Sequence, residues 1–384
     1  MADATPRRAL LLGHGGMLWP LPPVLRSAGF EVDVVTLPSP HFRHRIGLRT
    51  VKRLPDRRSL LVAAAELDRV RPYDWIIIGD DDTLLALRDS PDLSQAEKTR
   101  LAPVTAEEHL WRLGSKVGQA EALSRAGVTH PSSRAVKSED QAVEAATQIG
   151  WPVFLKADAG SAGRAVAKCD DAEELRREWR RLVDADKSNP TGPQTGGSPY
   201  PAIVQQAIPG TMLDLSGIFF DGRLIHFTNA LGNEMPGRIG MSSVRRYRPS
   251  AAGDAQVVGE LGAIGRTMGI HGFANISAIE DRNGVRWYFE VDLRPTIWAP
   301  YGAEFGDDPV HRLRAWFERG EALAASPAAA DNRQPMQGRA IACFTRQSRR
   351  DLVRNRTSVL RDVPWHNPDG VLLLAKSLIL GGDL

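Results

Sequence analysis

The chain has 384 residues, of which 42% are hydrophobic and 25% are charged, and its formal net charge at pH 7 is +3. These values exclude wholesale disorder, collagen-like and coiled-coil architectures, and the charge is too small for a constitutive nucleic-acid binder of this size. No apolar run approaches the ~18 residues that a membrane-spanning helix needs, and the two cysteines cannot form a disulfide framework or a four-ligand zinc site. We therefore expect a cytoplasmic protein that binds neither membranes nor nucleic acid.

The N-terminal region alternates short apolar strands with helical stretches. Strands are predicted at 9–12, 31–35 and 75–78, and the first and third end in glycine-containing or acidic turns. This alternation predicts a parallel βαβ sheet. Since ligands of such sheets bind beyond the carboxyl ends of the strands, we expect the turns at 13–16 and 79–82 at the functional edge.

The middle of the chain is predicted to form helices and antiparallel strands. Helices are expected at 110–125, 138–150 and 171–183, and strands at 153–156, 165–168, 202–206, 216–220, 224–228, 273–279 and 287–293. The turn at 281–284 is typical of a hairpin, and the Gly-, Pro- and Ser-rich segment 188–201 is predicted to be a connection.

Two basic clusters lie at 41–58 and 339–361, and each holds seven Lys or Arg residues and one acidic residue. Such clusters are typical of a solvated face or of a site for an anionic partner, and we favour the solvated face. The second cluster lies in a C-terminal extension that follows the Ala- and Pro-rich segment 324–338. Recruitment of an acidic substrate is a hypothesis for this extension.

Three segments carry residues suited to a bound nucleoside triphosphate. Lys156 ends a predicted strand and precedes a loop of small residues, whose glycines let backbone amides approach a polyphosphate. Lys116 lies forty residues upstream, near the start of a helix. The strand at 203–206 runs into a segment ending at Gly210, whose backbone is suited to pairing with a purine edge.

A fourth segment is suited to a metal and a phosphoryl group. Strand alternation predicts Glu290, Asp292 and Arg294 on one face. Two carboxylates at this spacing are oxygen ligands that suit a Mg²⁺ ion bridging phosphates. An arginine one step further can hold a transferring phosphoryl group.

The order and spacing of these segments resemble the ATP-grasp superfamily, of the carboxylate–amine ligase type. The resemblance covers roughly 112–297 and is carried by Ser115-Lys116, by 153–156 with 160–163, by 204–210 and by 290–295. It implies an α/β fold: a Rossmann-like pre-ATP-grasp domain followed by a two-lobed α+β ATP-grasp domain and a C-terminal extension. The domains expected are 1–111, the small lobe 112–200, the large lobe 201–323 and the extension 324–384.

The resemblance also implies ATP and Mg²⁺ as cofactors and a role for each matching residue. These roles are phosphate contacts from Lys116 and Lys156, a lid from Gly160, Ser161 and Gly163, adenine contacts from Gln205, Gln206, Ala207 and Ile208, a ribose contact nearest Asp214, metal ligation by Glu290 and Asp292, and catalysis by Lys156 and Arg294. The chain departs from the family where another metal-binding acid is usual, since that position falls near Ser277 or Ala278. Asn275 or Glu280 could take its place only with a shifted register.

The resemblance implies an enzyme that activates a carboxylate as an acyl phosphate for attack by an amine, forming an amide or peptide bond and releasing ADP and phosphate. The expected partners are small-molecule or peptide-like carboxylates and amines, and a homodimer is compatible with the sequence. The candidate substrate residues combine glycine, serine and charged groups: His14, Gly15, Gly16, Asp81, Arg238, Ser242, Ser243 and Arg245.

Three other functions are kept as alternatives. The missing metal acid is compatible with a noncatalytic ATP-grasp homologue that binds nucleotide. Gly13, Gly15 and Gly16 after the first strand prompt a nicotinamide-nucleotide oxidoreductase, although they lack the full GxGxxG spacing. The Arg-rich extension prompts nucleic-acid binding, but no recognised nucleic-acid module accompanies it.

Overall fold

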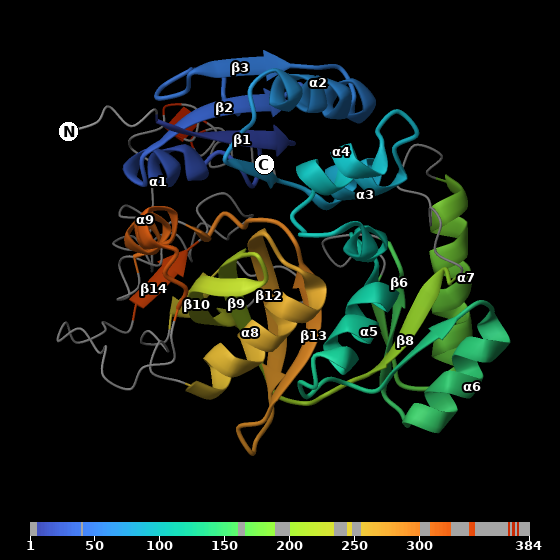
Figure 1. The fold of residues 1–384 in the computed structure, drawn as a ribbon. Helices are drawn as coiled ribbons and strands as arrows, with labels where there is room; N and C mark the ends of the chain where they lie inside the picture. Colours follow the sequence, from blue (N-terminus) through green and yellow to red (C-terminus); the bar gives the residue numbers. More distant parts are fainter. Residues whose placement is uncertain are drawn as a thin grey trace.

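The computed structural model describes residues 6–39, 41–159, 166–188, 200–233, 244–247, 255–299, 308–323 and 338–341, with the single positions 368, 371, 372 and 375. The described strands form three sheets (Figure 1). The lid residues Gly160, Ser161 and Gly163 and the substrate candidates Arg238, Ser242 and Ser243 lie outside the described residues. Most of the extension 324–384 does as well, and Arg245 is described only through its backbone.

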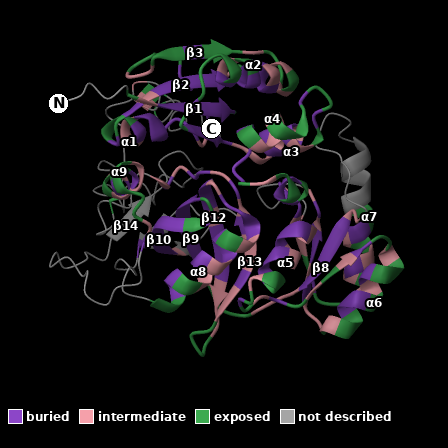
Figure 2. Cartoon of the chain, in the orientation of Figure 1, coloured by how far each residue is buried: buried purple, intermediate pink, exposed green. Residues whose placement is uncertain are grey.

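The first sheet is parallel, as the sequence predicts, with the strand order β3-β2-β1-β4. Its elements are β1 (Arg7–Gly13), α1 (Leu21–Ser27), β2 (Phe30–Thr36), β3 (Thr50–Arg53), α2 (Arg57–Val70), β4 (Trp75–Ile78), α3 (Asp81–Asp89) and α4 (Gln95–Leu101). Strand β3 was not predicted, because its sequence lies within a basic cluster and only Val51 is buried, as the green edge strand in Figure 2 shows.

Several arginines of this basic cluster pair with acids of the same domain. Arg49 pairs with the buried Asp33, and Arg58 lies 2.6 Å from Asp92. The cluster at 41–58 is therefore partly neutralised within the fold.

The second sheet is antiparallel, with the order β5-β8-β6-β7. It comprises β5 (Ser133–Val136), β6 (Val153–Ala157), β7 (Val166–Cys169) and β8 (Ala202–Gln206). Helices α6 (Glu139–Ile149) and α7 (Ala172–Ser188) pack on it through a small apolar core that includes Leu155, Leu175 and Val204 (Figure 1). The hairpin of β6 and β7 confirms the predicted return of the chain after Lys156.

The third sheet is antiparallel, with the order β13-β12-β9-β10-β11-β14. Its strands are β9 (Thr211–Phe220), β10 (Arg223–Asn233), β11 (Val244–Tyr247), β12 (Gly272–Glu280), β13 (Arg286–Asp292) and β14 (Gly338–Ile341), with α5 (Lys116–Arg125), α8 (Ala255–Met268) and α9 (Pro309–Arg319) nearby. The predicted hairpin is confirmed as β12 and β13.

The helix predicted at 110–125 is wrong at its start. A 3₁₀ helix, Glu107–Arg112, precedes α5, which begins at Lys116. The break follows from Gly114, whose φ of +68° is incompatible with a continuing helix, and from Ser115, whose hydroxyl accepts the Gly118 N–H as the N-cap. The turn predicted at 79–82 is also shorter, because Asp80 caps α3 and the helix starts at Asp81.

The parallel sheet and the third sheet share one apolar core. Trp75 of β4 is buried, stacks on Phe273 with ring centroids 5.1 Å apart, and meets Phe220 edge-on at 4.9 Å. Leu11 and Ile218 belong to the same cluster. This packing holds the parallel sheet against the third sheet, which positions the candidate site. No helix among the described residues has the length and apolarity to span a bilayer.

We predict that Trp75→Ala lowers the free energy of unfolding by about 3–5 kcal/mol, because it empties the core shared by the two sheets. Denaturant unfolding followed by circular dichroism measures this change. The control is Trp111→Ala, since Trp111 is 44% exposed and its loss is expected to change stability by about 0.5 kcal/mol. Equal effects of the two substitutions would contradict the shared core.

Candidate functional site

One face of the third sheet carries a polar surface. The strand register places Glu290, Ser277 and Asp214 in one row across β13, β12 and β9. A second row continues further, through Asp292, Asn275, Ser216 and Thr228 on β13, β12, β9 and β10. The opposite face is apolar and includes Leu213, Leu215, Ile276 and Val291, which are buried with residues of α5 and α8. Strand alternation therefore gives the sheet one apolar face and one mixed face, on which the polar rows are followed by Ile218 and Phe273 of the core shared with the parallel sheet.

Lys156 lies beside the carboxylates of this polar face. Its side chain is 6% exposed, and its Nζ donates a hydrogen bond of 2.7 Å to Gln205 Oε1. Burial lowers the pKa of Lys156 to about 8, and Lys116 contributes to the decrease, whereas the charges of Glu290 and Asp292 oppose it. Two lysines and two carboxylates predicted from separate segments therefore lie within electrostatic range of one another.

Asp158 fixes the start of α5 next to Lys156. Its Oδ1 accepts hydrogen bonds from the Ser115 hydroxyl at 2.9 Å and the Val117 N–H at 2.8 Å, and its carbonyl accepts from the Lys116 N–H at 3.0 Å. The sequence analysis did not single out Asp158. The available signal was an acid two residues after Lys156, combined with an N-cap serine forty-three positions earlier.

Arg294 connects the polar face to the parallel sheet. Its Nε donates to Asp81 Oδ1 at 2.8 Å and its Nη2 donates to Asp292 Oδ2 at 2.9 Å. Burial disfavours the charged guanidinium, but Asp292 and Asp81 outweigh it and raise the pKa of Arg294. Strand β13 ends at Asp292, so Arg294 lies beyond the strand rather than on it as predicted, although it still reaches the same site.

Asp292 itself is held in an unfavourable environment. Burial raises the pKa of its carboxyl group, and Glu290 and Asp81 add to the increase, while Arg294 and Lys116 oppose it. Ionisable groups with such a shift concentrate at functional sites, where burial and neighbouring charges are combined.

The segment predicted to bind adenine makes several contacts within the protein. Gln205 holds Lys156 through Oε1 and donates through Nε2 to Ser133 Oγ at 3.1 Å. The backbone N–H groups of Gln206 and Ala207 donate to the carbonyls of Ser132 and Pro152. Gln205 therefore positions Lys156, a role that the sequence did not suggest. Adenine binding by 205–208 and ribose binding by Asp214 stay predictions.

The predicted metal position contains two acidic side chains, Glu290 and Asp292. Ser277 pairs with Glu290, so the position of the expected third acid is occupied by serine, and Glu280 pairs with Arg286 at the far end of the hairpin. Among the described residues, no group of three or more His, Cys, Asp or Glu side chains is placed to hold a metal. Two carboxylates fit a Mg²⁺ ion that takes its other ligands from phosphates and water.

The carboxyl edge of the parallel sheet contributes the remaining candidates. The His14 N–H donates to Asp80 Oδ2 at 2.6 Å, and the Gly16 N–H donates to His14 Nδ1 at 3.3 Å. His41, which was not predicted, lies edge-on to the His14 ring with centroids 5.9 Å apart. The turns after β1 and β4 therefore meet at one edge, as the sequence predicts.

The chain is similar to several known proteins in sequence. Residues 115–190 match the family model described as carbamoyl-phosphate synthase L chain, ATP binding domain. A 74-residue segment is 42% identical to the 2-oxoglutarate carboxylase small subunit of Hydrogenobacter thermophilus, covering 19% of this chain and 16% of that protein. A 171-residue segment is 21% identical to a D-alanine–D-alanine ligase of Pseudomonas putida, covering 44% of this chain and 51% of that protein. The chain thus spans about half or less of the length of the curated relatives it matches.

The fold is similar to that of a solved carboxylase domain. The biotin carboxylase domain of the 2-oxoglutarate carboxylase from Hydrogenobacter thermophilus, solved as a dimer with MgADP, ADP and bicarbonate, superposes with a TM-score of 0.63 and 16% identity. The superposition covers 84% of this chain and 72% of that chain. At this identity the likeness concerns the fold.

We predict a pH-dependent effect of Lys156→Met on stability. The pKa of Lys156 is about 8 in the folded protein and 10.5 ordinarily. Between these pH values, Lys156 is therefore protonated in the unfolded chain and neutral in the folded protein. The free-energy cost of burying the protonated Lys156 is fully present below pH 8 and disappears as the pH rises to 10.5. The stability of the parent relative to this variant should therefore rise by roughly 3 kcal/mol across that window. Urea unfolding at several pH values measures it, and the exposed Lys52→Met variant should give a flat difference.

We predict strong coupling between Asp81 and Arg294. Both side chains are less than 15% exposed, so a double-mutant cycle with Asp81→Asn and Arg294→Met should give a coupling energy of about 1–3 kcal/mol in unfolding experiments. The matched control is the surface pair of Arg58 and Asp92, for which less than about 1 kcal/mol is expected. A coupling energy no larger than that of the surface pair would show that the contact between Asp81 and Arg294 is not formed.

Proposed function

Because the chain has the ATP-grasp fold, we propose that it is an ATP-dependent ligase that activates a carboxylate as an acyl phosphate for attack by an amine. One observation carries the proposal. Lys116 and Lys156 lie within electrostatic range of Glu290 and Asp292, which matches the charges needed to hold a magnesium-bound triphosphate. The products expected are ADP, phosphate and an amide or peptide bond.

Each part of the site has a role in this proposal. Lys116 and Lys156 would bind the phosphate oxygens, with Gln205 and Asp158 holding the lysines in place. Glu290 and Asp292 would hold Mg²⁺, which supplies charge neutralisation on the phosphates when it is bound. Arg294 would orient the phosphoryl group in transfer, and Asp81 would fix the direction of its guanidinium. Such positioning and charge complementarity account for most of the catalysis in phosphoryl transfer.

The proposal names an amine as the nucleophile. This choice is supported by the similarity to a D-alanine–D-alanine ligase over 171 residues. The similarity to a carboxylase subunit is shorter in extent, 74 residues, although higher in identity. The turns bearing His14, Gly15 and Gly16 lie at the carboxyl edge of the parallel sheet, where an acceptor substrate would enter.

One observation favours a second candidate, a noncatalytic homologue that binds nucleotide. Ser277 occupies the position opposite Glu290 where a third acid is expected. A hydroxyl is a weaker magnesium ligand than a carboxylate, so this candidate retains the nucleotide site and lacks turnover.

We predict that MgADP raises the melting temperature and that NADH does not. Release of ADP and phosphate is then measured over pairs of carboxylates and amines. Glu290→Gln should lower kcat by at least about 100-fold, because it removes one of the two metal-binding carboxylates. Lys156→Ala should abolish the MgADP shift.

The matched controls are Glu173→Gln and Lys52→Ala, since both side chains are exposed and lie outside the site. Nucleotide binding without turnover on any pair would favour the noncatalytic homologue. Release of AMP and pyrophosphate would contradict the acyl-phosphate mechanism, and a shift with NADH alone would contradict the nucleotide class.

A further inference from the structure

Strand β13 contains a β-bulge directly before Glu290. The residues on either side of Phe289 pair with successive positions of β12, which leaves Phe289 as an extra residue in the register. Tyr288 and Val291 both lie in the apolar core with α5 and α8, three positions apart, whereas regular alternation brings every second residue to one face. Such bulges re-aim a side chain and are frequent next to active sites.

The ring of Phe289 lies against Lys156. The Lys156 Nζ is 4.8 Å from the centroid of the Phe289 ring and 5.9 Å from that of the Phe154 ring. Both distances are within the ~6 Å over which an ammonium group is attracted to an aromatic face. Phe289 is partly exposed and belongs to none of the apolar clusters of the described residues, so core packing does not account for the position of its ring.

Neutral groups, rather than carboxylates, hold the Lys156 ammonium. Its Nζ donates to Gln205 Oε1 and otherwise faces the two rings. The charges of Glu290 and Asp292 act on Lys156, yet among the described residues no ion pair joins the ammonium to either carboxylate. Glu290 also forms no ion pair with any other residue that the structure describes, so its oxygens stay available to a metal.

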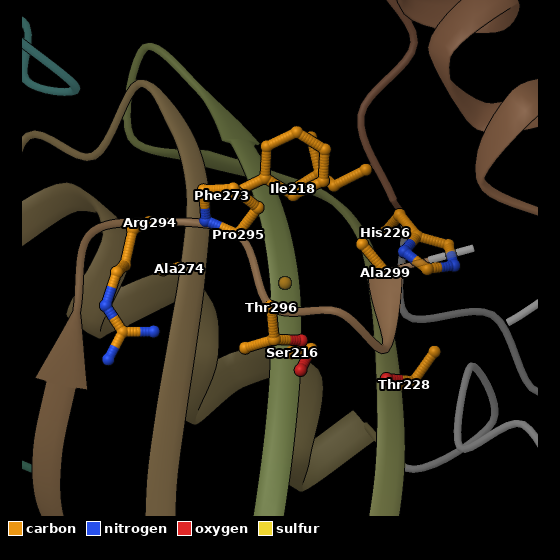
Figure 3. Close-up of a pocket in the computed structure, with 11 residues that line it drawn as sticks. Ser216, Ile218, His226, Thr228, Phe273, Ala274, Arg294, Pro295, Thr296 and Ala299 are labelled. Carbon is orange, nitrogen blue, oxygen red and sulfur yellow. The ribbon is translucent and has the colours of Figure 1, made fainter. Parts of the chain in front are cut away.

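Arg294 shows the other way in which a cation is held at this site. It pairs with Asp81 and Asp292 at 2.8 and 2.9 Å, and its guanidinium points away from Phe273 (Figure 3). An arginine held in this way offsets the charge of the carboxylates that it contacts. If Lys156 were held by a carboxylate of the predicted metal position, that carboxylate would be occupied by the lysine.

We propose that Phe289 is a positioning residue, whose ring holds the Lys156 ammonium apart from Glu290. The lysine then stays free for the phosphates, and the carboxylate stays free for Mg²⁺. Without the ring, Lys156 pairs with Glu290 and competes with the metal. This inference rests on the proposed function, because it assigns a role within the same nucleotide site.

The test measures how ADP binding depends on Mg²⁺. ADP is titrated by calorimetry into the full chain at a series of Mg²⁺ concentrations, for the parent and for Phe289→Leu, which removes the ring and keeps an apolar side chain. We expect the Mg²⁺ concentration that gives half of the full ADP affinity to rise about 5-fold, as the loss of one cation–π contact in a buried site predicts. Saturating Mg²⁺ should bring the affinity back to within about 2-fold of the parent value, because the metal then displaces the lysine.

Two further variants of Phe289 show whether the ring itself is responsible. Phe289→Tyr retains an aromatic face and should keep the Mg²⁺ dependence of the parent. Phe289→Met is a second variant without a ring and should behave like Phe289→Leu. Adenosine, which has no phosphate and needs no Mg²⁺, is titrated by ligand-observed NMR and should bind the parent and all three variants equally.

Phe317→Leu on α9 is the matched control. Phe317 is also partly exposed, and the Arg7 guanidinium lies over its ring at 5.4 Å, but it is outside the site. Its loss should leave the Mg²⁺ dependence of ADP binding unchanged.

The outcomes separate this inference from the proposed function. An unchanged Mg²⁺ dependence in Phe289→Leu and Phe289→Met, or an equal change in Phe289→Tyr, overturns the positioning role and leaves the ligase proposal standing. Weaker binding of adenosine, and of ADP at every Mg²⁺ concentration, also overturns it, because the ring would then contact the base. Failure of the parent to bind ADP with Mg²⁺ overturns the ligase proposal and the role of Phe289 with it.

Discussion

The buried pairing of Arg294 with Asp81 and Asp292 is the interaction on which the rest of the site depends. Asp81 belongs to the carboxyl edge of the parallel sheet, whereas Asp292 ends a strand of the third sheet. A guanidinium removed from water is stabilised only when carboxylates surround it in good geometry. Since Asp81 begins the helix after β4 and Asp292 ends β13, the pairing holds the two halves of the site together as well as orienting the arginine.

Apolar packing on the same face as the site has the complementary function. Trp75, Phe220 and Phe273 form a continuous contact between the parallel sheet and the third sheet. Along β12, Phe273 and Ser277 lie on one face, so the aromatic contact and the polar rows follow one another on that face. The opposite face of the third sheet packs against α5 and α8.

Several groups at the site are less stable than they would be in water. The pKa of Lys156 is lowered by burial, and the pKa of Asp292 is raised by burial, so both charged forms are disfavoured. Gln205 and Asp158 fix the surrounding side chains and backbone through hydrogen bonds. In the proposed function, an anionic ligand carrying a divalent cation would offset the cost of burying both charged groups.

The sequence by itself determined the elements and the chemical character of the site. The continuous apolar run at 75–78 predicts a buried strand, and the alternation from Phe289 to Asp292 predicts two carboxylates on one face, because these patterns depend only on the period of a strand. Lys156 followed by a glycine-containing loop likewise predicts phosphate binding from neighbouring residues alone.

Only the tertiary structure decided which of these groups meet. The pairing of Asp81 with Arg294 joins positions 213 residues apart, and the hydrogen bond from Lys156 to Gln205 joins positions 49 apart. Hairpin geometry limited the position opposite Glu290 to Ser277 or Ala278, and strand pairing selects Ser277. Local periodicity contains no information on these contacts, because they depend on the free energy of burying distant apolar surfaces together.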